Sequence, residues 1–222
     1  NDINPGFDPR NIVLFEMRPP LSEYSGAKQI ALFRQLTERL AAVPGVESVT
    51  PTTVAPLSHN YENDDFIPVG EKVTPEMDTA SLNSTVGDAY FATFRIPILM
   101  GRSFAPTDTE TSPRVAVVNQ ALAREYFPSE SPIGKSFVTS GSKNEKLTYR
   151  IVGVCGNTRY GSLREDPPPI FYLNYRQAPE IDWGLSFAVR TRTARAAITP
   201  SLRKAVQSVD RNLPLIDIRT QQ

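Results

Sequence analysis

The sequence predicts an α+β fold in which the two ends of the chain form one split βαβ unit and the middle forms an inserted mixed α/β part. Two observations lead to this prediction. A strand–helix–strand pattern occurs near the N-terminus and again near the C-terminus, with similar connections from helix to strand. The segment between them has a different pattern, with a short helix and a hairpin. The simplest packing places both end units in one sheet, with their helices on the same face.

The N-terminal unit begins with a strand over residues 11–18, whose apolar side chains alternate between two faces. A helix over residues 27–43 follows, and Pro44 and Gly45 end it before a strand over residues 46–51. The apolar residues of the helix recur at helical spacing and predict one buried face: Ile30, Phe33, Leu36 (or Thr37), Leu40 and Val43.

The C-terminal unit repeats this plan with a strand over residues 185–192 and a closing strand over residues 212–219. Thr199 is expected to cap the helix between them, with Pro200 at the first helical position. The buried face of this helix is expected to carry Leu202, Ala205, Val206 and Val209.

The middle of the chain is predicted to contain a strand over residues 79–87, a short helix begun by Asp88, a strand over residues 113–119 that leads into a helix ended by Pro128, and a hairpin over residues 135–156. Because a hairpin keeps its two strands together, the second strand of this hairpin belongs with Phe137 and not with the end units.

Two stretches indicate where the middle begins and ends. The polar run SHNYENDD follows Leu57, and EDPPP, Glu165–Pro169, forms a stiff extended connector. We therefore expect residues 1–58 and 168–222 to form one discontinuous subdomain and residues 59–167 to form the inserted one.

The composition indicates a packed globular protein and argues against one class of partner. Of the 222 residues, 40% are hydrophobic and 22% are charged. Lys and Arg together number 24, as do Asp and Glu, so the chain lacks the basic excess of a typical nucleic-acid binder. No run approaches the roughly 18 apolar residues of a membrane span, and no signal-peptide pattern is found. The chain begins and ends without a recognisable start or stop signal in its sequence, as expected for a piece of a longer protein.

The octet SESPIGKS, Ser129–Ser136, comes within one residue of the phosphate-binding signature GxxxxGK[ST]. A phosphate loop needs a strand before it and a helix after it, and here the expected order is reversed. Pro132 also removes an amide donor from a loop that binds phosphate through its amides. We therefore interpret the octet as a turn in which Gly134 gives backbone freedom before a strand, and expect no nucleotide site.

Candidate catalytic and metal-binding residues are few. His59 is the only histidine and lies in a polar stretch without a nucleophile motif, so a surface role is favoured. Cys155 is the only cysteine and is expected to be a buried small hydrophobe. Glu62, Asp64 and Asp65 form a weak candidate for a calcium loop, but the spacing of a calcium-binding loop is missing, and a solvated acidic loop is favoured.

A resemblance to a known family is carried by three long stretches in order: VGDAYFATFRIPILMGRSFAPTDT, RVAVVNQALAREYFPSESPIGKSF and YRIVGVCGNTRYGSLREDPPPIFYLNY. Together with GFDPRNIVLF at the start and LRKAVQSVDRNLPLIDIRT at the end, they resemble the periplasmic core domain of MacB-type ABC transporter permeases, in particular the duplicated orphan permeases. Cys155 and Asn157 depart from the residues common in that family. The family-signature positions in this sequence are Gly87, Tyr90, Phe91, Gly101, Arg102, Asn119, Phe127, Pro132, Gly134, Gly153 and Gly156.

The resemblance implies a non-catalytic domain on the periplasmic side of the inner membrane, between the first and second membrane spans of a permease. It implies a porter-like part made by both chain ends and an inserted sabre-like part. No cofactor is expected. The implied partners are the protein's own membrane-spanning helices, a cytoplasmic ATPase domain or subunit, a second copy in a homodimer and a periplasmic adaptor. We expect such a domain to transmit ATP-driven helix movement to the periplasmic side, for export or for mechanotransmission.

Two alternatives stay open at this stage. One is a soluble domain that binds or hydrolyses a ligand in a cleft between the two parts. The other is a relative of the same superfamily that acts in lipoprotein handling or cell division. An apolar run of about 20 residues just before the chain, and three more after it, would favour the permease.

Overall fold

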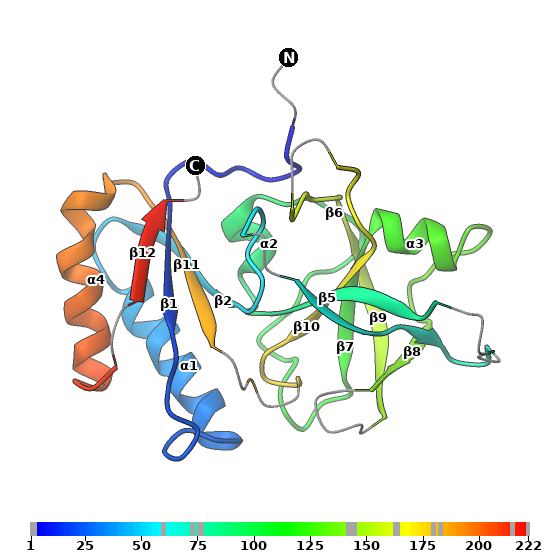
Figure 1. Cartoon of the computed structure of the whole chain (residues 1–222), viewed down its shortest axis with the longest axis horizontal. Helices are drawn as coiled ribbons and strands as arrows, with labels where there is room; N and C mark the ends of the chain where they lie inside the picture. Colours follow the sequence, from blue (N-terminus) through cyan, green and yellow to red (C-terminus); the bar gives the residue numbers. More distant parts are fainter. Residues whose placement is uncertain are drawn as a thin grey trace.

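A computed structural model describes residues 4–58, 61–71, 74, 78–140, 146–161, 165–178, 181, 184–213 and 216–220. His59 lies outside these residues. The strands of the described residues form one 12-stranded sheet with the central order β12-β1-β11-β2-β5-β10-β7-β9-β8-β4 (Figure 1). The sheet combines an end part, made by both ends of the chain, with a middle part, made by the segment between them.

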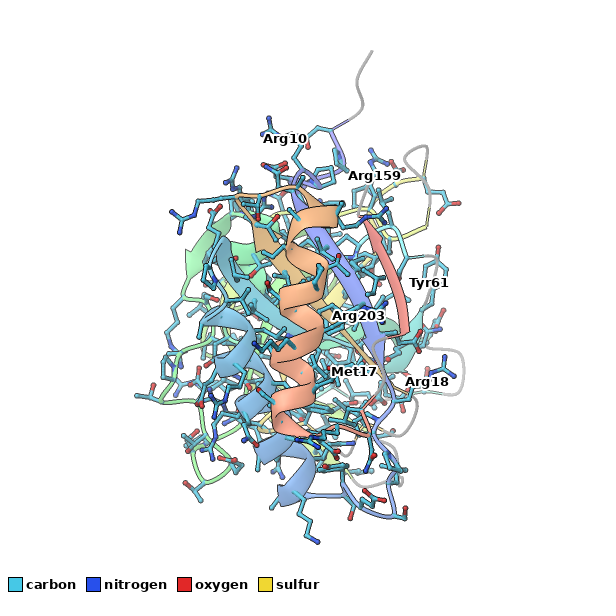
Figure 2. All side chains as sticks on the ribbon, turned by 90° about the vertical axis from the view of Figure 1, so that its left-hand side faces the viewer. Arg10, Met17, Arg18, Tyr61, Arg159 and Arg203 are labelled. Atoms are coloured by element: carbon cyan, nitrogen blue, oxygen red, sulfur yellow. The ribbon has the colours of Figure 1, made fainter. Side chains whose placement is uncertain are left out.

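The end part consists of β1 (Ile12–Met17), α1 (Ala27–Ala41), β2 (Val46–Thr52), β11 (Leu185–Thr191), α4 (Arg195–Val209) and β12 (Ile216–Thr220). β11 lies between the parallel strands β1 and β2, and β1 lies between β11 and β12, with every neighbouring pair antiparallel. This is the split βαβ arrangement that the sequence predicts. Both helices cover the same face of the sheet, as Figure 2 shows from the helix side.

The core beneath these helices follows the predicted periodicities. Phe15 of β1 stacks on Phe187 of β11 with ring centroids 5.6 Å apart, and Phe33 of α1 packs against Phe187. On α1, Phe33, Leu36 and Leu40 are buried as predicted, because these positions share one side of a helix. On α4, the buried residues are Ile198, Leu202 and Val206.

The start of α4 differs from the prediction. The helix begins at Arg195, so Thr199 and Pro200 lie inside it, and the N-cap residue is Ala194. The Thr199 hydroxyl donates a hydrogen bond to the Arg195 carbonyl, 2.8 Å away, instead of capping the helix. The additional turn brings Ile198 into the core, where it is 3% exposed. Pro200 removes one backbone hydrogen bond near the helix start, and burial of the apolar face offsets this loss.

The middle part consists of β3 (Glu62–Asp65), β4 (Ile67–Pro68), β5 (Ala80–Val86), α2 (Tyr90–Phe94), β6 (Ile98–Gly101), β7 (Val115–Asn119), α3 (Gln120–Tyr126), β8 (Ser136–Thr139), β9 (Leu147–Cys155) and β10 (Ile170–Asn174). β8 and β9 form the predicted hairpin, with Phe137 opposite Tyr149. No strand was predicted at β3, β4, β6 or β10.

β10 needs a correction to its expected place. The predicted boundary assigned residues 168–222 to the end part, yet β10 pairs with β5 on one side and β7 on the other, and both belong to the middle part. All five residues of β10 are buried. A strand that is apolar on both faces needs cover on both, and a central place in the sheet provides it. The division into two subdomains itself stays a prediction.

β3 and β4 connect two distant strands of the middle part, β5 and β8. β3 pairs with β5, whereas β4 pairs with β8 at the far side of this part of the sheet. Phe66 lies between β3 and β4 and is fully buried. Its ring stacks on Phe137 at 4.2 Å and contacts Phe171 at 5.8 Å between centroids. An aromatic cluster therefore fills the space that the strands enclose.

The acidic run that was considered as a calcium loop is a strand, β3, and not a solvated loop. Its carboxylates accept hydrogen bonds from protein groups: Asp65 from the hydroxyls of Thr79 and Ser140, both at 2.6 Å, and Asp64 from the Ser140 amide at 3.1 Å. The Glu62 carboxylate accepts from the Thr53 hydroxyl at 2.9 Å. Asp64 and Asp65 therefore fasten β3 to Ser140 at the end of β8, whereas Glu62 binds Thr53 just after β2.

No helix among the described residues is long and apolar enough to cross a membrane.

The first testable prediction concerns Asp65. Hydrogen bonds from Ser140 and then Thr79 hold the pKa of this carboxyl below its ordinary value of 3.8. Asp65→Asn should therefore lower the free energy of unfolding by about 1 kcal/mol at pH 7, measured by urea denaturation. The carboxylate's contribution is complete above pH 3.8 and is lost as the pH falls through the lower folded value, so the difference between the two proteins should shrink below pH 3.8.

Glu71→Gln serves as the control, because it makes the same charge change at an exposed side chain. Equal effects of the two substitutions at pH 7 would contradict the role given to Asp65.

Candidate functional site

The end part and the middle part meet at a buried arginine. Arg190, on β11, is 2% exposed and lies on the face of the sheet opposite α1 and α4. Its guanidinium donates to the carbonyls of Thr93 at 2.6 Å, Arg10 at 2.8 Å and Asp8 at 2.7 Å. Thr93 belongs to α2, and the other two belong to the segment before β1. One side chain therefore holds two separate pieces of backbone through three carbonyls, because the planar guanidinium offers five donors.

A carboxylate beside Arg190 extends this junction to the surface. Asp8 accepts hydrogen bonds from Arg10 Nε at 2.9 Å and Arg95 Nη1 at 2.8 Å, and Arg190 Nη1 lies 3.7 Å from its Oδ2. The hydrogen bond from Arg10 is the main reason that the pKa of Asp8 lies well below its ordinary value. Burial lowers the pKa of Arg190, and the Arg95 charge acts in the same direction. Arg190 nevertheless remains a cation, because an arginine does not lose its proton in a protein.

The helix α2 ends at this junction in a strained conformation. Arg95, its C-cap, has φ 56°, in the left-handed region that non-glycine residues rarely adopt. The Asp8 amide donates to the Phe94 carbonyl at 2.9 Å, and Arg95 also reaches Glu47 at 3.4 Å. Ion pairs to two different segments thus hold Arg95 in place.

A second connection between the parts runs through β2 and β5, which share only the register pair Thr52 and Val86. Hydrogen bonds just beyond it continue the connection: the Thr53 amide donates to the Thr85 carbonyl and the Gly87 amide to the Pro51 carbonyl, both at 2.9 Å.

Gly87 is required by this close approach. A Cβ at this position would lie 2.5 Å from Pro51 Cδ, closer than real side chains allow. Any larger residue would force β2 and β5 apart.

Asp88 differs from its predicted role as the start of α2, whose N-cap is Ala89 without a side-chain cap. The Asp88 carboxylate instead accepts from Asn174 Nδ2 and Arg176 Nη2, both at 2.8 Å. Burial raises the pKa of Asp88, and these two partners oppose the rise. Asp88 does not cap α2 because it lies beside the end of β10, where the Asn174 amide and the Arg176 guanidinium each bind one of its two carboxylate oxygens.

The hydroxyl groups of three tyrosines meet beneath α2. Tyr90 of α2, Tyr160 and Tyr172 of β10 form a chain with O···O distances of 2.9 and 3.0 Å. Burial raises the pKa of all three and brings that of Tyr160 to about 12, so all three are neutral at physiological pH. Cys155, also fully buried, has a thiol pKa that burial raises, and the sequence correctly predicted its burial.

The octet that resembles a phosphate loop is a turn between α3 and β8, as predicted. Its backbone amides bind protein atoms: Ile133 donates to Ser131 Oγ at 3.3 Å, Gly134 to the Ile151 carbonyl at 2.8 Å and Lys135 to the Pro132 carbonyl at 3.0 Å. These amides are not free to hold a phosphate.

Several of the remaining family-signature residues hold neighbouring elements of the middle part together. Asn119 caps α3 by accepting from the Leu122 amide at 2.9 Å, and it also binds Ile170 N and the Pro168 carbonyl at the start of β10. Gly101 and Gly153 lie where β6 and β9 touch. A Cβ on Gly153 would be 2.1 Å from the Arg102 carbonyl.

The other signature residues have structural contacts of the same kind. Phe91 packs on Tyr172, Phe127 on Phe66, and the Gly156 amide donates to the Pro97 carbonyl. Arg102 forms a bidentate ion pair with Asp108, at 2.7 and 2.9 Å. Among the described residues, no group of three or more His, Cys, Asp or Glu side chains could hold a metal ion.

Residues 4–209 match the family described as the MacB-like periplasmic core domain. The chain belongs to this family. A curated relative, the macrolide export ATP-binding/permease protein MacB of Aggregatibacter actinomycetemcomitans, is 25% identical over 118 residues, which cover 53% of this chain and 16% of that protein. The chain therefore spans only a small share of this relative's length.

Solved structures of MacB-like domains share the fold. The periplasmic region of MacB from Actinobacillus actinomycetemcomitans superposes with a TM-score of 0.63 at 16% identity, covering 97% of this chain and 91% of that one. The extracellular domain of the ABC-type transporter YknZ from Gram-positive bacteria gives a TM-score of 0.55 at 16% identity, covering 93% and 99%. These likenesses establish the fold of the MacB-like domain.

Sequence reasoning gave no role to Arg190, Asp8, Arg95 or Arg176. The only signal for Arg190 was a charge that follows the apolar residues Ala188 and Val189 in β11, and a single charge near the end of a strand does not show whether it is buried or exposed. The partners of Arg190 lie far away in sequence, so no local pattern could indicate them.

Replacement of Arg190 tests the junction of this MacB-like domain. Arg190→Met removes the donors to a buried carbonyl of α2 and to two part-buried carbonyls of the N-terminal segment, and should lower the free energy of unfolding by about 3–5 kcal/mol in urea denaturation. Arg190→Lys keeps the charge but loses the fork of donors, and should fall between that variant and the unchanged protein.

The matched control is Arg192→Met, which changes an exposed arginine two residues further along. It should alter the unfolding free energy by less than about 0.5 kcal/mol. Similar losses for Met at positions 190 and 192 would refute the role of Arg190.

Proposed function

We propose that this MacB-like domain is the extracytoplasmic, non-catalytic domain of an ABC transporter permease. In this proposal it carries ATP-driven movement of membrane helices to the periplasmic side, for export or for mechanotransmission. ATP is hydrolysed elsewhere, by a cytoplasmic ATPase domain or subunit. Family membership supports the location, and the geometry of the chain ends supports the mechanism.

The observation that carries the proposal is the position of the first and last strands. β1 and β12 are antiparallel neighbours, with Val13 opposite Thr220, so the chain enters and leaves the sheet at one end (Figure 1). Arg10 and Arg159 mark this end in Figure 2. Membrane helices joined to the two ends would therefore act on the same edge of the domain, and any relative movement of these helices would tilt it.

The buried junction supports movement of the domain as one body. The sheet continues from β12 to β4, and Arg190 ties α2 and the N-terminal segment to β11. Since breaking these contacts would leave a buried charge without partners, the junction resists bending. A tilt at the chain ends would then turn the middle part by the same angle. This expectation holds whether or not residues 1–58 with 168–222 and residues 59–167 form two separate subdomains.

The proposal includes four partners. They are the protein's own membrane-spanning helices, the ATPase, a second copy of the permease in a homodimer, and a periplasmic adaptor that contacts the middle part. No cofactor and no nucleic acid take part.

Distance measurements in the full permease test the mechanism. Spin labels at Arg34→Cys on α1 and Arg124→Cys on α3 report on the end part and the middle part, since both positions are exposed. Cys155 can stay, because it is fully buried. Pulsed EPR should give one distance between the two labels with and without ATP. The distance from either label to a membrane-embedded label should change.

A distance between positions 34 and 124 that shifts with ATP would show bending within the domain and contradict transmission by a rigid body. A domain that does not move relative to the membrane would contradict transmission altogether. The apolar runs expected on both sides of the chain are checked by the flanking gene sequence.

A further inference from the structure

The middle part carries a groove of about 590 Å³ that takes no part in the junction. Its wall residues come from the end of β6, the start of β7, the turn before β8 and the central residues of β9. In sequence order they include Arg102, Pro113, Val115, Ile133, Arg150 and Val152. Ligand pockets commonly enclose about 300–1,000 Å³, so the groove has the capacity for a small molecule.

An irregularity in β9 lies in the wall of this groove. β8 pairs with β9 up to Arg150, and β6 pairs with it from Gly153 onward. β7 pairs with the other side of β9 from Arg150 to Cys155, so β6 and β8 follow one another along one side. The register between β7 and β9 shifts between Ile151 and Gly153, and the carbonyls of Ile151 and Val152 accept from Gly134 and Arg102 respectively. A bulge bends a strand locally, and this one lies at Val152, where the pairing of β9 with β8 ends and its pairing with β6 begins.

The groove has one positive charge without a counter-charge. Arg102 is neutralised by its bidentate pair with Asp108. Lys135, on the turn beside the groove, pairs with Glu130 at 2.6 Å. The Arg150 side chain is exposed, and within the part of the chain that the structure describes its guanidinium has no hydrogen-bond or ion-pair partner.

Gly134 keeps the Arg150 guanidinium accessible from the groove. Gly134 has φ 86°, and a Cβ there would lie 3.5 Å from Arg150 Nη2. A side chain at this position would therefore be strained and would also lie against the guanidinium. The absence of one leaves the fork of Arg150 open beside a wall made of valine, isoleucine and proline side chains.

We infer that this groove binds a small amphiphile with one anionic head group. The head, a carboxylate or a phosphate ester, pairs with the guanidinium of Arg150, which matches the two oxygens of either group bidentately. The apolar chain lies along Val115, Ile133 and Val152. The inference does not depend on the transmission mechanism and adds a ligand site to it.

Titration of the isolated chain followed by NMR tests the site. Octanoate should give saturable shifts of the Gly134 and Val152 amides at millimolar concentration. Acetate and inorganic phosphate, which lack the chain, should give none up to about 10 mM, a limit that corresponds to only about 3 kcal/mol of binding. Octyl phosphate distinguishes the head groups: tighter binding than octanoate assigns a phosphate ester, and weaker binding assigns a carboxylate.

Arg150→Gln should weaken octanoate binding about tenfold, since a charged hydrogen bond is worth about 1.5–3 kcal/mol. The control is Arg203→Gln on α4, which removes an exposed arginine from the helix layer seen in Figure 2 and should leave the affinity unchanged. Both side chains are exposed, so both variants should fold.

Three outcomes would overturn the inference. They are the absence of a saturable shift with either octyl compound, shifts confined to other residues, and equal octanoate binding by Arg150→Gln and the unchanged chain. None of these outcomes would bear on the movement of the full permease.

Discussion

The guanidinium of Arg190 is buried and donates to carbonyls of α2 and of the segment before β1. A buried charge must be fully hydrogen-bonded, so this single side chain fixes the distance between two stretches of backbone that belong to different parts of the chain. The left-handed Arg95 and the ion pairs of Asp8 are consequences of the same constraint, because they occur where α2 is held against the N-terminal segment. The end part and the middle part are thereby joined through polar contacts in addition to the continuous sheet.

The junction at Arg190 decides what the arrangement of the chain ends can do mechanically. The first and last strands are neighbours, so forces from attached helices would enter the domain at one edge, and the junction would pass them to the middle part. The middle part is stiffened in a different way. Its strands close around Phe66, Phe137 and Phe171, and carboxylates of β3 bind the end of β8. Apolar packing also joins the two parts, because Leu14 of β1 lies in one buried cluster with Tyr90 of α2 and Tyr172 of β10. This shared cluster and the polar contacts at the junction together supply the coupling.

Much of the end part could be predicted from the sequence, because its helices and strands carry strong periodic patterns that local packing obeys. The split βαβ unit, the buried face of α1 and the hairpin of β8 and β9 followed from such patterns. The predicted start of α4 was wrong. Thr199 and Pro200 are typical of a helix start, but burial of Ile198 favours a helix that begins earlier, at Arg195. β3 was missed because acidic residues are unusual in strands, and β10 was missed because it is buried on both faces and shows no alternation of apolar and polar residues. The junction was out of reach: Arg190 and its partners are brought together only by the fold, and a lone charge in a strand does not reveal what it binds.

Native-state hydrogen exchange of the isolated chain tests the coupling most directly. If the junction makes the two parts one cooperative unit, the slowest amides of β11, α2 and β5 should exchange with the same opening free energy and respond equally to low concentrations of urea. An opening free energy for α2 and β5 several kcal/mol below that of β11 would show that the middle part unfolds on its own, and would contradict the central role given to Arg190.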